Sequence, residues 1–174
     1  MEEGSQRAAG SGTYRMPAEW SSHQATWISW PHNADTWPGH LPGVERTMAE
    51  AVGALASSEL VRINVRDAAH GYHVQKLLAG RVPPERVVLH QFPTNDAWCR
   101  DHGAIFVTRD AADGAPLLAL DFEYNAWGGK YPPYDLDNAI PGRMAEALGI
   151  PVRHMPMVLE GGSIEVNGRG VLLT

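Results

Sequence analysis

The sequence has little cysteine, no long apolar run and no cluster of basic residues. Cys99 is the only cysteine among 174 residues. A disulfide within the chain is therefore excluded, and with no evident secretory signal we expect a reducing, cytoplasmic compartment. No apolar stretch approaches the length needed to cross a bilayer, so we expect no membrane role. The net charge is −6 and no run of Lys or Arg could follow a phosphate backbone, which argues against nucleic acid as a partner.

What is present fits one soluble globular domain. Hydrophobic residues make up 44% of the chain and charged residues 20%, which is enough apolar sequence to bury a core. Residues 1–13 combine charged and small side chains without periodicity, so we expect a disordered tail followed by a single domain over residues 14–174.

Hydrophobic periodicity predicts alternating strands and helices. Asp67 is a plausible N-cap and Gly80 a plausible stop for one helix, and Asp113-Gly114 and Asn167-Gly168 are expected hairpin turns. The mixture of hairpins and helices indicates an α+β or mixed α/β fold. Strands are expected at 25–30, 60–65, 86–90, 104–108, 116–121, 151–154, 163–166 and 170–173, and helices at 44–58, 67–79 and 137–148.

The predicted strand over 170–173 runs into the last residue, Thr174. An apolar strand with no following element to cover it leads us to expect that the chain is part of a larger domain. Exposed apolar surface at that edge would favour association, including a possible homodimer.

A first polar constellation occupies residues 94–101, TNDAWCRD. The carboxylates of Asp96 and Asp101 with the indole of Trp98 could hold a planar cation. A carboxylate accepts paired N–H donors from a guanidinium, and a Trp face attracts positive charge. The same residues could equally form an Asx turn with an Arg–Asp pair that fastens a loop.

Two further stretches combine aromatic or acidic residues with paired glycines. In residues 121–134, Trp127 could line a pocket beside Gly128-Gly129, or belong to an aromatic surface loop packed on the core. Glu160 follows an apolar run and precedes two glycines. It could accept a hydrogen bond from an imidazole or a substrate, or be a solvated residue beside a Gly-Gly bulge.

Cysteine and histidine chemistry is less evident in the sequence. Cys99 lacks an obvious base, and Trp98 and Asp101 share one face only if the segment turns. His70 and His73 lie three residues apart on one predicted helix face without a third metal ligand nearby, and we expect both to be exposed. His102 could lie near the site because it follows Asp101 directly.

Four linked stretches resemble agmatine deiminases and Porphyromonas-type peptidylarginine deiminases. These are the segment from MPAEW to Pro31 with His23, Trp27 and Trp30, then NDAWCRD at 95–101, NAWGGKY at 125–131 and EGGSIEVNG at 160–168. Their order and spacing match over about residues 14–174. The resemblance implies a pentein β/α-propeller of five ββαβ blades, of which this chain would cover about half.

The resemblance also implies roles for particular residues. Trp98 and Asp101 would meet a substrate guanidinium, and Glu160 would lie at the same site and orient a catalytic His. We expect Asp101 and Glu160 in catalysis, and Trp98, Asp96, Trp30 and Trp127 as substrate contacts. The family's catalytic Cys and His-x-Asp stretch come later in its sequences and have no counterpart here.

The reaction implied by the resemblance converts agmatine to N-carbamoylputrescine and ammonia through an amidino-cysteine, without metal or organic cofactor. The discriminating contacts to the substrate tail are not located, so peptidyl-arginine stays open as a substrate. An alternative is a catalytically inactive half-propeller that binds guanidino compounds or a partner protein. A carboxylate-pair glycosidase is a third reading of the composition, but the linked motifs argue against it.

Overall fold

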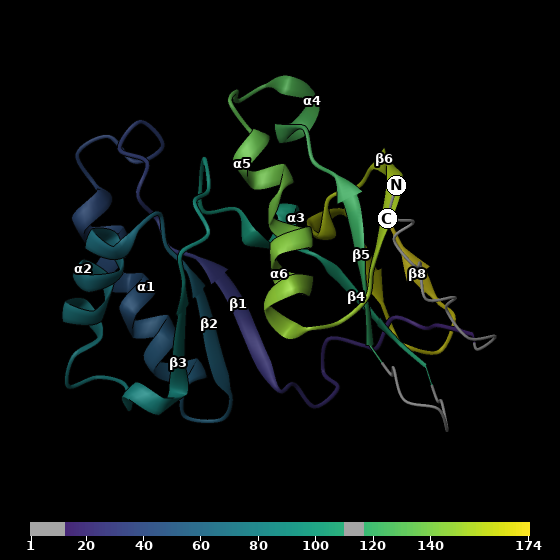
Figure 1. Ribbon diagram of the computed structural model, residues 1–174, viewed down its shortest axis with the longest axis horizontal. Coiled ribbons are helices and arrows are strands. Elements are labelled where there is room, and N and C mark those ends of the chain that lie inside the picture. Colours follow the sequence, from purple (N-terminus) through teal and green to yellow (C-terminus); the bar gives the residue numbers. More distant parts are fainter. Residues whose placement is uncertain (1–12, 110–116) are drawn as a thin grey trace, which may run out of the picture.

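The computed structural model describes residues 13–109 and 117–174. The expected tail therefore lies, except for Thr13, outside the described residues, and so does the predicted Asp113-Gly114 turn. The described chain has a mixed α/β fold with two three-stranded sheets and a two-stranded hairpin (Figure 1). No helix among the described residues is long and apolar enough to cross a membrane.

The first sheet is parallel throughout, in the order β1 (Ala25–Ser29), β2 (Leu60–Asn64) and β3 (Val87–His90). Parallel neighbours need crossover connections. These are supplied by α1 (Leu41–Leu55) and by α2 (Ala68–Leu78) with the short η1 (Pro84–Arg86). Both α-helices lie on the same outer side of the sheet, at the left of Figure 1.

The main core lies between this sheet and its two helices. Alternation along the strands sends one set of side chains toward the helices and the other toward the rest of the molecule. The buried residues of this core are Trp30, Ala49, Val52, Ala56, Val61, Ile63, Val65, Val74, Leu78 and Val82.

Helix α2 begins as predicted, because the Asp67 side chain accepts a hydrogen bond of 2.8 Å from the His70 backbone N–H. The expected exposure of His70 is wrong: the residue is buried, and burial lowers its pKa to about 4. Its Nδ1 accepts from the Arg66 backbone N–H, while the half-exposed His73 contacts Glu45 at 2.8 Å.

The second sheet has β5 (Leu117–Glu123) at its centre. It pairs antiparallel with β4 (Ile105–Thr108) and parallel with β6 (Val152–Val158). Between β5 and β6 the chain forms α4 (Ala126–Gly129), α5 (Asp135–Asn138) and α6 (Ile140–Leu148). Helix α6 lies against β5, on the side facing the first sheet (Figure 1).

The single helix expected over 137–148 is two helices in the structure. Pro141 lies in the first turn of α6, where its missing N–H leaves no helical hydrogen bond unmade. A new helix therefore starts there, and α5 begins earlier than predicted. Gly149 ends α6 in the left-handed conformation, with φ of 62°.

The last hairpin pairs β7 (Glu165–Val166) with β8 (Leu172–Leu173), antiparallel as predicted. The connection covers residues 167–171 and is longer than the expected two-residue turn. The Asn167 side-chain oxygen organises it by accepting from the backbone N–H groups of Arg169 and Val171, at 2.8 and 3.1 Å.

Candidate functional site

The TNDAWCRD stretch closes into a single helical turn, α3 (Cys99–His102). The Trp98 carbonyl accepts from the backbone N–H groups of Asp101 and His102, at 2.9 and 3.0 Å. The turn separates neighbouring side chains: Trp98 is 39% exposed, whereas His102 is buried. Arg100 points elsewhere and forms ion pairs with Glu19 and, at 3.6 Å, with Glu165.

Asp101 lies in α3, which contacts the short η2 (Gly161–Ser163) that follows Glu160, although 59 positions separate the two carboxylates in the sequence. Burial, and then the negative charge of Glu160, raise the pKa of Asp101, while the Gly162 backbone N–H and Arg100 act in the opposite direction. A Cβ at Gly162 would collide with the Asp101 carboxylate, and one at Gly161 with the Arg100 carbonyl. The two glycines thus let the short η2 (Gly161–Ser163) pack directly on α3.

Asp96 is engaged by the protein itself. Its Oδ2 accepts from the Thr36 hydroxyl and, at 3.4 Å, from the Asn33 amide, while its Oδ1 accepts from the Ala97 N–H at 2.7 Å. The carboxylate thereby anchors the loop that leads from β1 to α1. These hydrogen bonds give Asp96 a part in shaping the loop, and its expected contact with a substrate stays a prediction.

Trp30 requires a correction. We expected it to contact substrate, but its side chain is fully buried in the core of the first sheet, and its indole N–H donates to Glu45 at 2.9 Å. Trp30 shares a strand face with Ile28, the face that α1 and α2 cover. Its position therefore serves packing.

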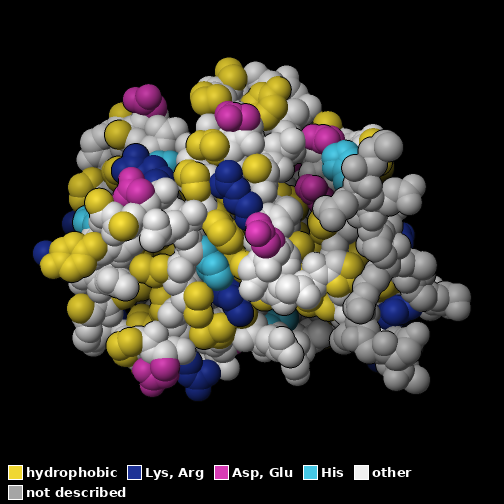
Figure 2. Space-filling view, in the orientation of Figure 1, with side chains coloured by type: hydrophobic (Ala, Val, Ile, Leu, Met, Phe, Trp, Pro, Cys, Tyr) yellow, Lys and Arg dark blue, Asp and Glu magenta, His cyan; other side chains and the backbone are white. Residues whose placement is uncertain are grey.

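Four aromatic side chains form a row over the junction between the two sheets. Trp98 lies between Trp37, at 6.1 Å between ring centroids, and Trp127, at 5.7 Å. Tyr131 continues the row, 5.9 Å from Trp127. Hydrophobic side chains gather over α4 at the top of the space-filling view (Figure 2).

Trp127 reaches this row through a left-handed turn. Ala126, Trp127, Gly128 and Gly129 all have positive φ, of 50°, 57°, 80° and 75°. The conformation is unfavourable for the first two, by about 1–2 kcal/mol per residue. Asn125 holds the turn together, because its side chain accepts from the Gly128 N–H at 2.8 Å and its carbonyl from the Gly129 N–H. Backbone strain of this kind is typical of positions with functional constraints.

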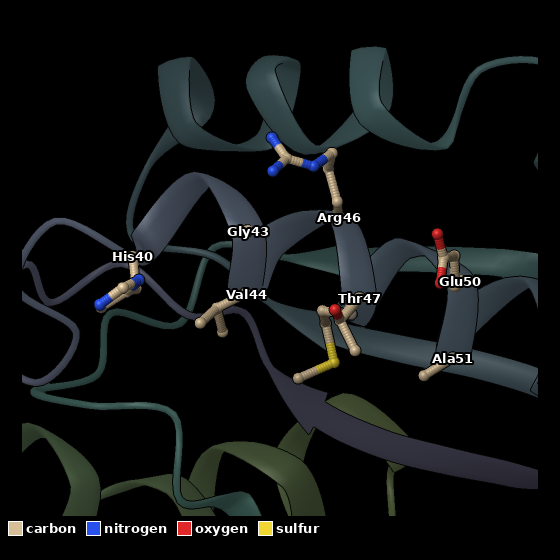
Figure 3. A pocket seen from close by; sticks show the side chains of 8 residues that line it. His40, Gly43, Val44, Arg46, Thr47, Glu50 and Ala51 are labelled. Atoms are coloured by element: carbon tan, nitrogen blue, oxygen red, sulfur yellow. The ribbon is translucent and has the colours of Figure 1, made fainter.

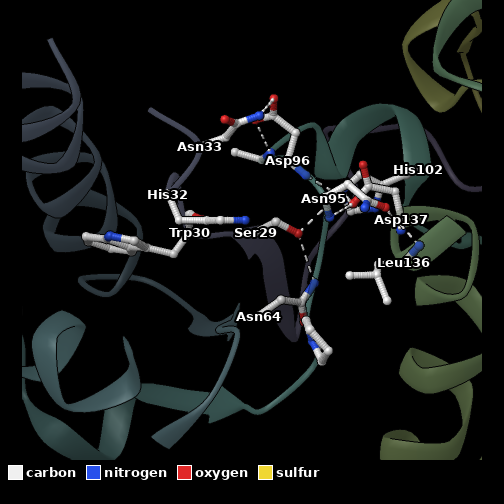
Figure 4. Close-up of polar contacts among 12 residues, drawn as sticks. Ser29, Trp30, His32, Asn33, Asn64, Asn95, Asp96, His102, Leu136 and Asp137 are labelled. Atoms are coloured by element: carbon white, nitrogen blue, oxygen red, sulfur yellow. Dashed lines mark hydrogen bonds and ion pairs between the residues drawn. The ribbon is translucent and has the colours of Figure 1, made fainter. Parts of the chain in front are cut away.

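A reciprocal pair of residues joins α3's loop to α5. Asp137 accepts from the Asn95 N–H at 2.7 Å, while the Asn95 side chain accepts from the N–H groups of Leu136 and Asp137, at 2.8 and 3.2 Å (Figure 4). Burial raises the pKa of Asp137 to about 6, against the opposing effect of these hydrogen bonds.

Behind the site lies a buried polar group. Ser29 Oγ accepts from Asn64 at 3.1 Å and lies 3.4 Å from His102 Nε2 (Figure 4). Burial lowers the pKa of His102 to about 4, so this imidazole is neutral at physiological pH. Cys99 borders the same group, and burial raises the pKa of its thiol to about 12, although the residue as a whole is only half-buried. A thiol with such a raised pKa carries little of the reactive thiolate at neutral pH.

Tyr124 lies close enough to four carboxylates for their charges to act on its phenol. The residue is buried at the end of β5, with ring contacts to His102 and Trp127 at 5.9 and 5.8 Å. Burial raises the pKa of its phenol, and the charges of four carboxylates raise it further; these are Asp137, Asp101, Asp96 and Glu160. All four carboxylates therefore act on one small region.

The structure thus brings together Asp101, Glu160, Trp98 and Trp127 of the predicted site. Sequence reasoning missed Trp37 and Tyr124. Trp37 follows a strand end in a loop, a position where functional residues are frequent, and this could have drawn attention to it. Tyr124 had no comparable signal, because a tyrosine at a strand end is more often a packing residue.

Neither of two surface hollows coincides with this region. One, of about 610 Å³, lies along α1 and is lined by residues including Val44, Thr47 and Ala51 (Figure 3). The other, of about 530 Å³, lies between α2 and β3 and is lined mainly by apolar residues. Within the described ranges, no group of three or more His, Cys, Asp or Glu residues could hold a metal ion.

Comparison with known proteins gives consistent similarities. The family described as Porphyromonas-type peptidyl-arginine deiminase matches residues 15–174. A relative from Marinomonas sp. named "Putative agmatine deiminase" is 34% identical over 165 residues, which is 92% of this chain and 42% of that protein.

Among solved structures, the agmatine deiminase of Enterococcus faecalis is similar with a TM-score of 0.81 at 29% identity, over 92% of this chain and 43% of that one. A substrate-bound agmatine deiminase of C. jejuni is similar with a TM-score of 0.80 at 28% identity, over 94% and 46%. The chain thus spans less than half the length of these relatives.

Proposed function

Because this chain belongs to the Porphyromonas-type peptidyl-arginine deiminase family, we propose that it forms the guanidinium-holding part of an agmatine deiminase-type hydrolase. The observation that carries the proposal is the close packing of residues 160–162, beginning with Glu160, on the helical turn that carries Asp101 and follows the exposed Trp98. We take agmatine as the substrate because the similar proteins of E. faecalis and C. jejuni are named agmatine deiminases.

The charges at the site suit a permanent cation. Two adjacent carboxylates repel each other, and a guanidinium between them would relieve that repulsion while donating paired N–H groups to each. The Trp98 face would add cation–π attraction of about 0.5–2 kcal/mol, depending on how much water is excluded. Trp127 would close one side of the bound headgroup.

The proposed reaction proceeds through a covalent intermediate. Asp101 and Glu160 hold the guanidinium so that its central carbon is open to a thiolate. Addition of sulfur gives a tetrahedral centre, which expels ammonia after an imidazole donates a proton. Water then adds to the amidino-cysteine and the thiolate leaves. The sum is agmatine plus water giving N-carbamoylputrescine plus ammonia.

The thiolate and its imidazole would come from polypeptide beyond these 174 residues. Cys99 has a thiol pKa of about 12 and lies against Ser29, so it supplies too little thiolate for attack. His102 is fully buried, and burial lowers its pKa to about 4, so it is not available as the proton donor. We further propose a five-bladed pentein propeller for the whole protein, a cytoplasmic location and assembly as a homodimer.

The buried thiol of Cys99 also supports a second function for the chain. With its single thiol buried, the chain as it stands could be an inactive half-propeller that binds guanidino compounds or a partner protein. The two functions share the headgroup contacts and differ only in turnover.

Both functions can be tested on the purified chain. Agmatine is titrated while the indole N–H signals are followed by NMR, and ammonia is measured in parallel. We expect the Trp98 signal to shift, no ammonia to form, and Asp101→Asn to weaken binding about tenfold or more, since a charged hydrogen-bond partner is lost. Glu85→Gln, which changes an exposed carboxylate outside the site, is the matched control.

Two outcomes would contradict the assignment. If the Asp101→Asn and Glu85→Gln variants bound agmatine equally well, Asp101 would not be a ligand contact. Ammonia release that disappears in a Cys99→Ser variant would place the nucleophile inside this chain.

A further inference from the structure

The feature that the proposed reaction does not use is Trp37, at the far end of the aromatic row. Trp37 is half-buried and its ring lies 6.1 Å from Trp98, tilted by 33°. It belongs to the loop between β1 and α1, whereas Trp98 and Trp127 come from the later part of the chain. The first aromatic ring of the row thus comes from a separate segment of the chain, the loop between β1 and α1.

This segment is fixed in place by hydrogen bonds that converge on Asp96. The Thr36 hydroxyl donates to Asp96 Oδ2, and Asn33 donates to the same oxygen at 3.4 Å. Asn33 also accepts from the Asp35 N–H at 3.0 Å, which shapes the loop immediately before Trp37. Trp37 therefore stands beside Trp98 because its neighbour is tied to the loop that carries Trp98.

The charges are unequal at the two ends of the row. Near Trp37, the Asp96 carboxylate accepts a hydrogen bond from the hydroxyl of the neighbouring Thr36. At the opposite end Lys130 places its ammonium 5.2 Å from the ring centroid of Tyr131. A second positive charge on a ligand would therefore be attracted toward Trp37 and repelled from Tyr131.

We infer that Trp37 is a specificity-determining residue, which receives a positively charged group at the far end of the guanidino substrate. The inference rests on the proposed function, because it takes the guanidinium to be held by Trp98, Asp101 and Glu160. The length of such a ligand agrees: the six bonds between the guanidinium carbon and a terminal ammonium, across four methylenes, reach about 7 Å. That is close to the spacing of the Trp37 and Trp98 rings.

Three ligands separate the charge on the tail from the headgroup. Agmatine has an ammonium at the tail end, butylguanidine has an uncharged tail of the same length, and arginine adds a carboxylate. We expect the chain to bind agmatine about two- to fivefold more tightly than butylguanidine, the range of an exposed cation–π contact. Arginine should bind less well than agmatine, because the Asp96 carboxylate would repel its carboxylate.

The variants isolate Trp37 from its surroundings. Trp37→Ala should bring the agmatine-to-butylguanidine ratio close to one, and Trp37→Phe should keep part of it. Thr36→Val removes the hydroxyl that anchors the loop without altering charge, and should lower the ratio as well. Trp20→Ala, which removes a Trp that is 77% exposed and outside the row, should leave the ratio unchanged.

The outcomes distinguish this inference from the proposed function. If Trp98→Ala abolishes binding of both guanidines while Trp37→Ala and Thr36→Val keep the wild-type ratio, the role of Trp37 is refuted and the headgroup site stands. If Trp98→Ala leaves butylguanidine binding intact, or if the chain binds none of the three ligands, both proposals fall. Should Trp37→Ala not fold, Trp37→Phe and Thr36→Val decide the question.

Discussion

Replacing Asp137 by Asn should make the protein more stable at neutral pH, even though Asp137 is at the centre of a hydrogen-bonded contact. The Asp137 carboxylate is buried, and burial, reinforced by Asp96 and Asp135, raises its pKa to about 6 from an ordinary 3.8. The group accepts from two backbone N–H groups through Oδ1 alone. An Asn side chain offers a carbonyl oxygen in the same place and carries no charge.

The size of the effect follows from the pKa difference. At about 1.4 kcal/mol per pH unit, the difference between 3.8 and about 6 corresponds to about 3 kcal/mol, an upper limit for the gain in the Asn variant. The sign follows from linkage, because the folded protein holds the proton more tightly than the unfolded chain. The contribution of the protonated Asp137 carboxyl to the free energy of unfolding is complete below about pH 4. It is lost as the pH rises through about 6 and does not change further above that.

Urea unfolding of both proteins between pH 4 and 8 measures this. The advantage of Asp137→Asn over wild type should grow from near zero at pH 4 to a plateau above pH 6. Asp137→Ala should be less stable than wild type at every pH, because it leaves the Asn95 N–H without its acceptor. A pH-independent difference between the Asn variant and wild type, or a less stable Asn variant at pH 7, would refute the reasoning.

Three further predictions concern single positions. Gly128→Ala should destabilise the fold by about 1 kcal/mol in urea unfolding, because φ there is 80° and a Cβ meets strain but no clash; no loss would mean that the left-handed turn is not formed. Asp67→Ala should cost about 1 kcal/mol through the lost N-cap of α2, and Asp67→Ser should restore most of it, in the same assay. Cys99 should resist iodoacetamide at pH 8 in the folded chain and react in 6 M urea; mass spectrometry would detect labelling of the native protein, which would contradict the buried thiol.

The sequence predicted the elements that carry their own local signals. The N-cap at Asp67 and the alternation along β2 identify α2 and its neighbouring strand without reference to the rest of the chain. The alternation of side chains along β1 could also have predicted the burial of Trp30, because Ile28 and Trp30 lie on the same strand face and point into the core. We expected a substrate contact there from the family resemblance, and a resemblance in residue type and position alone does not distinguish a site indole from a core indole.

The rest of the site depends on contacts between distant segments. The Thr36 hydroxyl meets Asp96 across 60 positions and Asn95 meets Asp137 across 42, so neither pairing has a signature within one motif. The density of acidic and aromatic residues drew attention to Asp101 and Glu160, whose roles stay predictions. It could not show that Asp96, in the same stretch, would be turned toward the protein.

The single turn of α3 has a consequence for how this stretch can vary. Its consecutive side chains have three different surroundings. Trp98 and Asp101 lie in the region that we propose for the ligand, Cys99 and His102 border the buried polar group, and Arg100 forms the ion pairs with Glu19 and Glu165. Inserting one residue would rotate everything after it by about 100°, which would exchange these surroundings. A substitution here changes one of these surroundings, whereas a stretch of altered length would present the wrong side chain to all three.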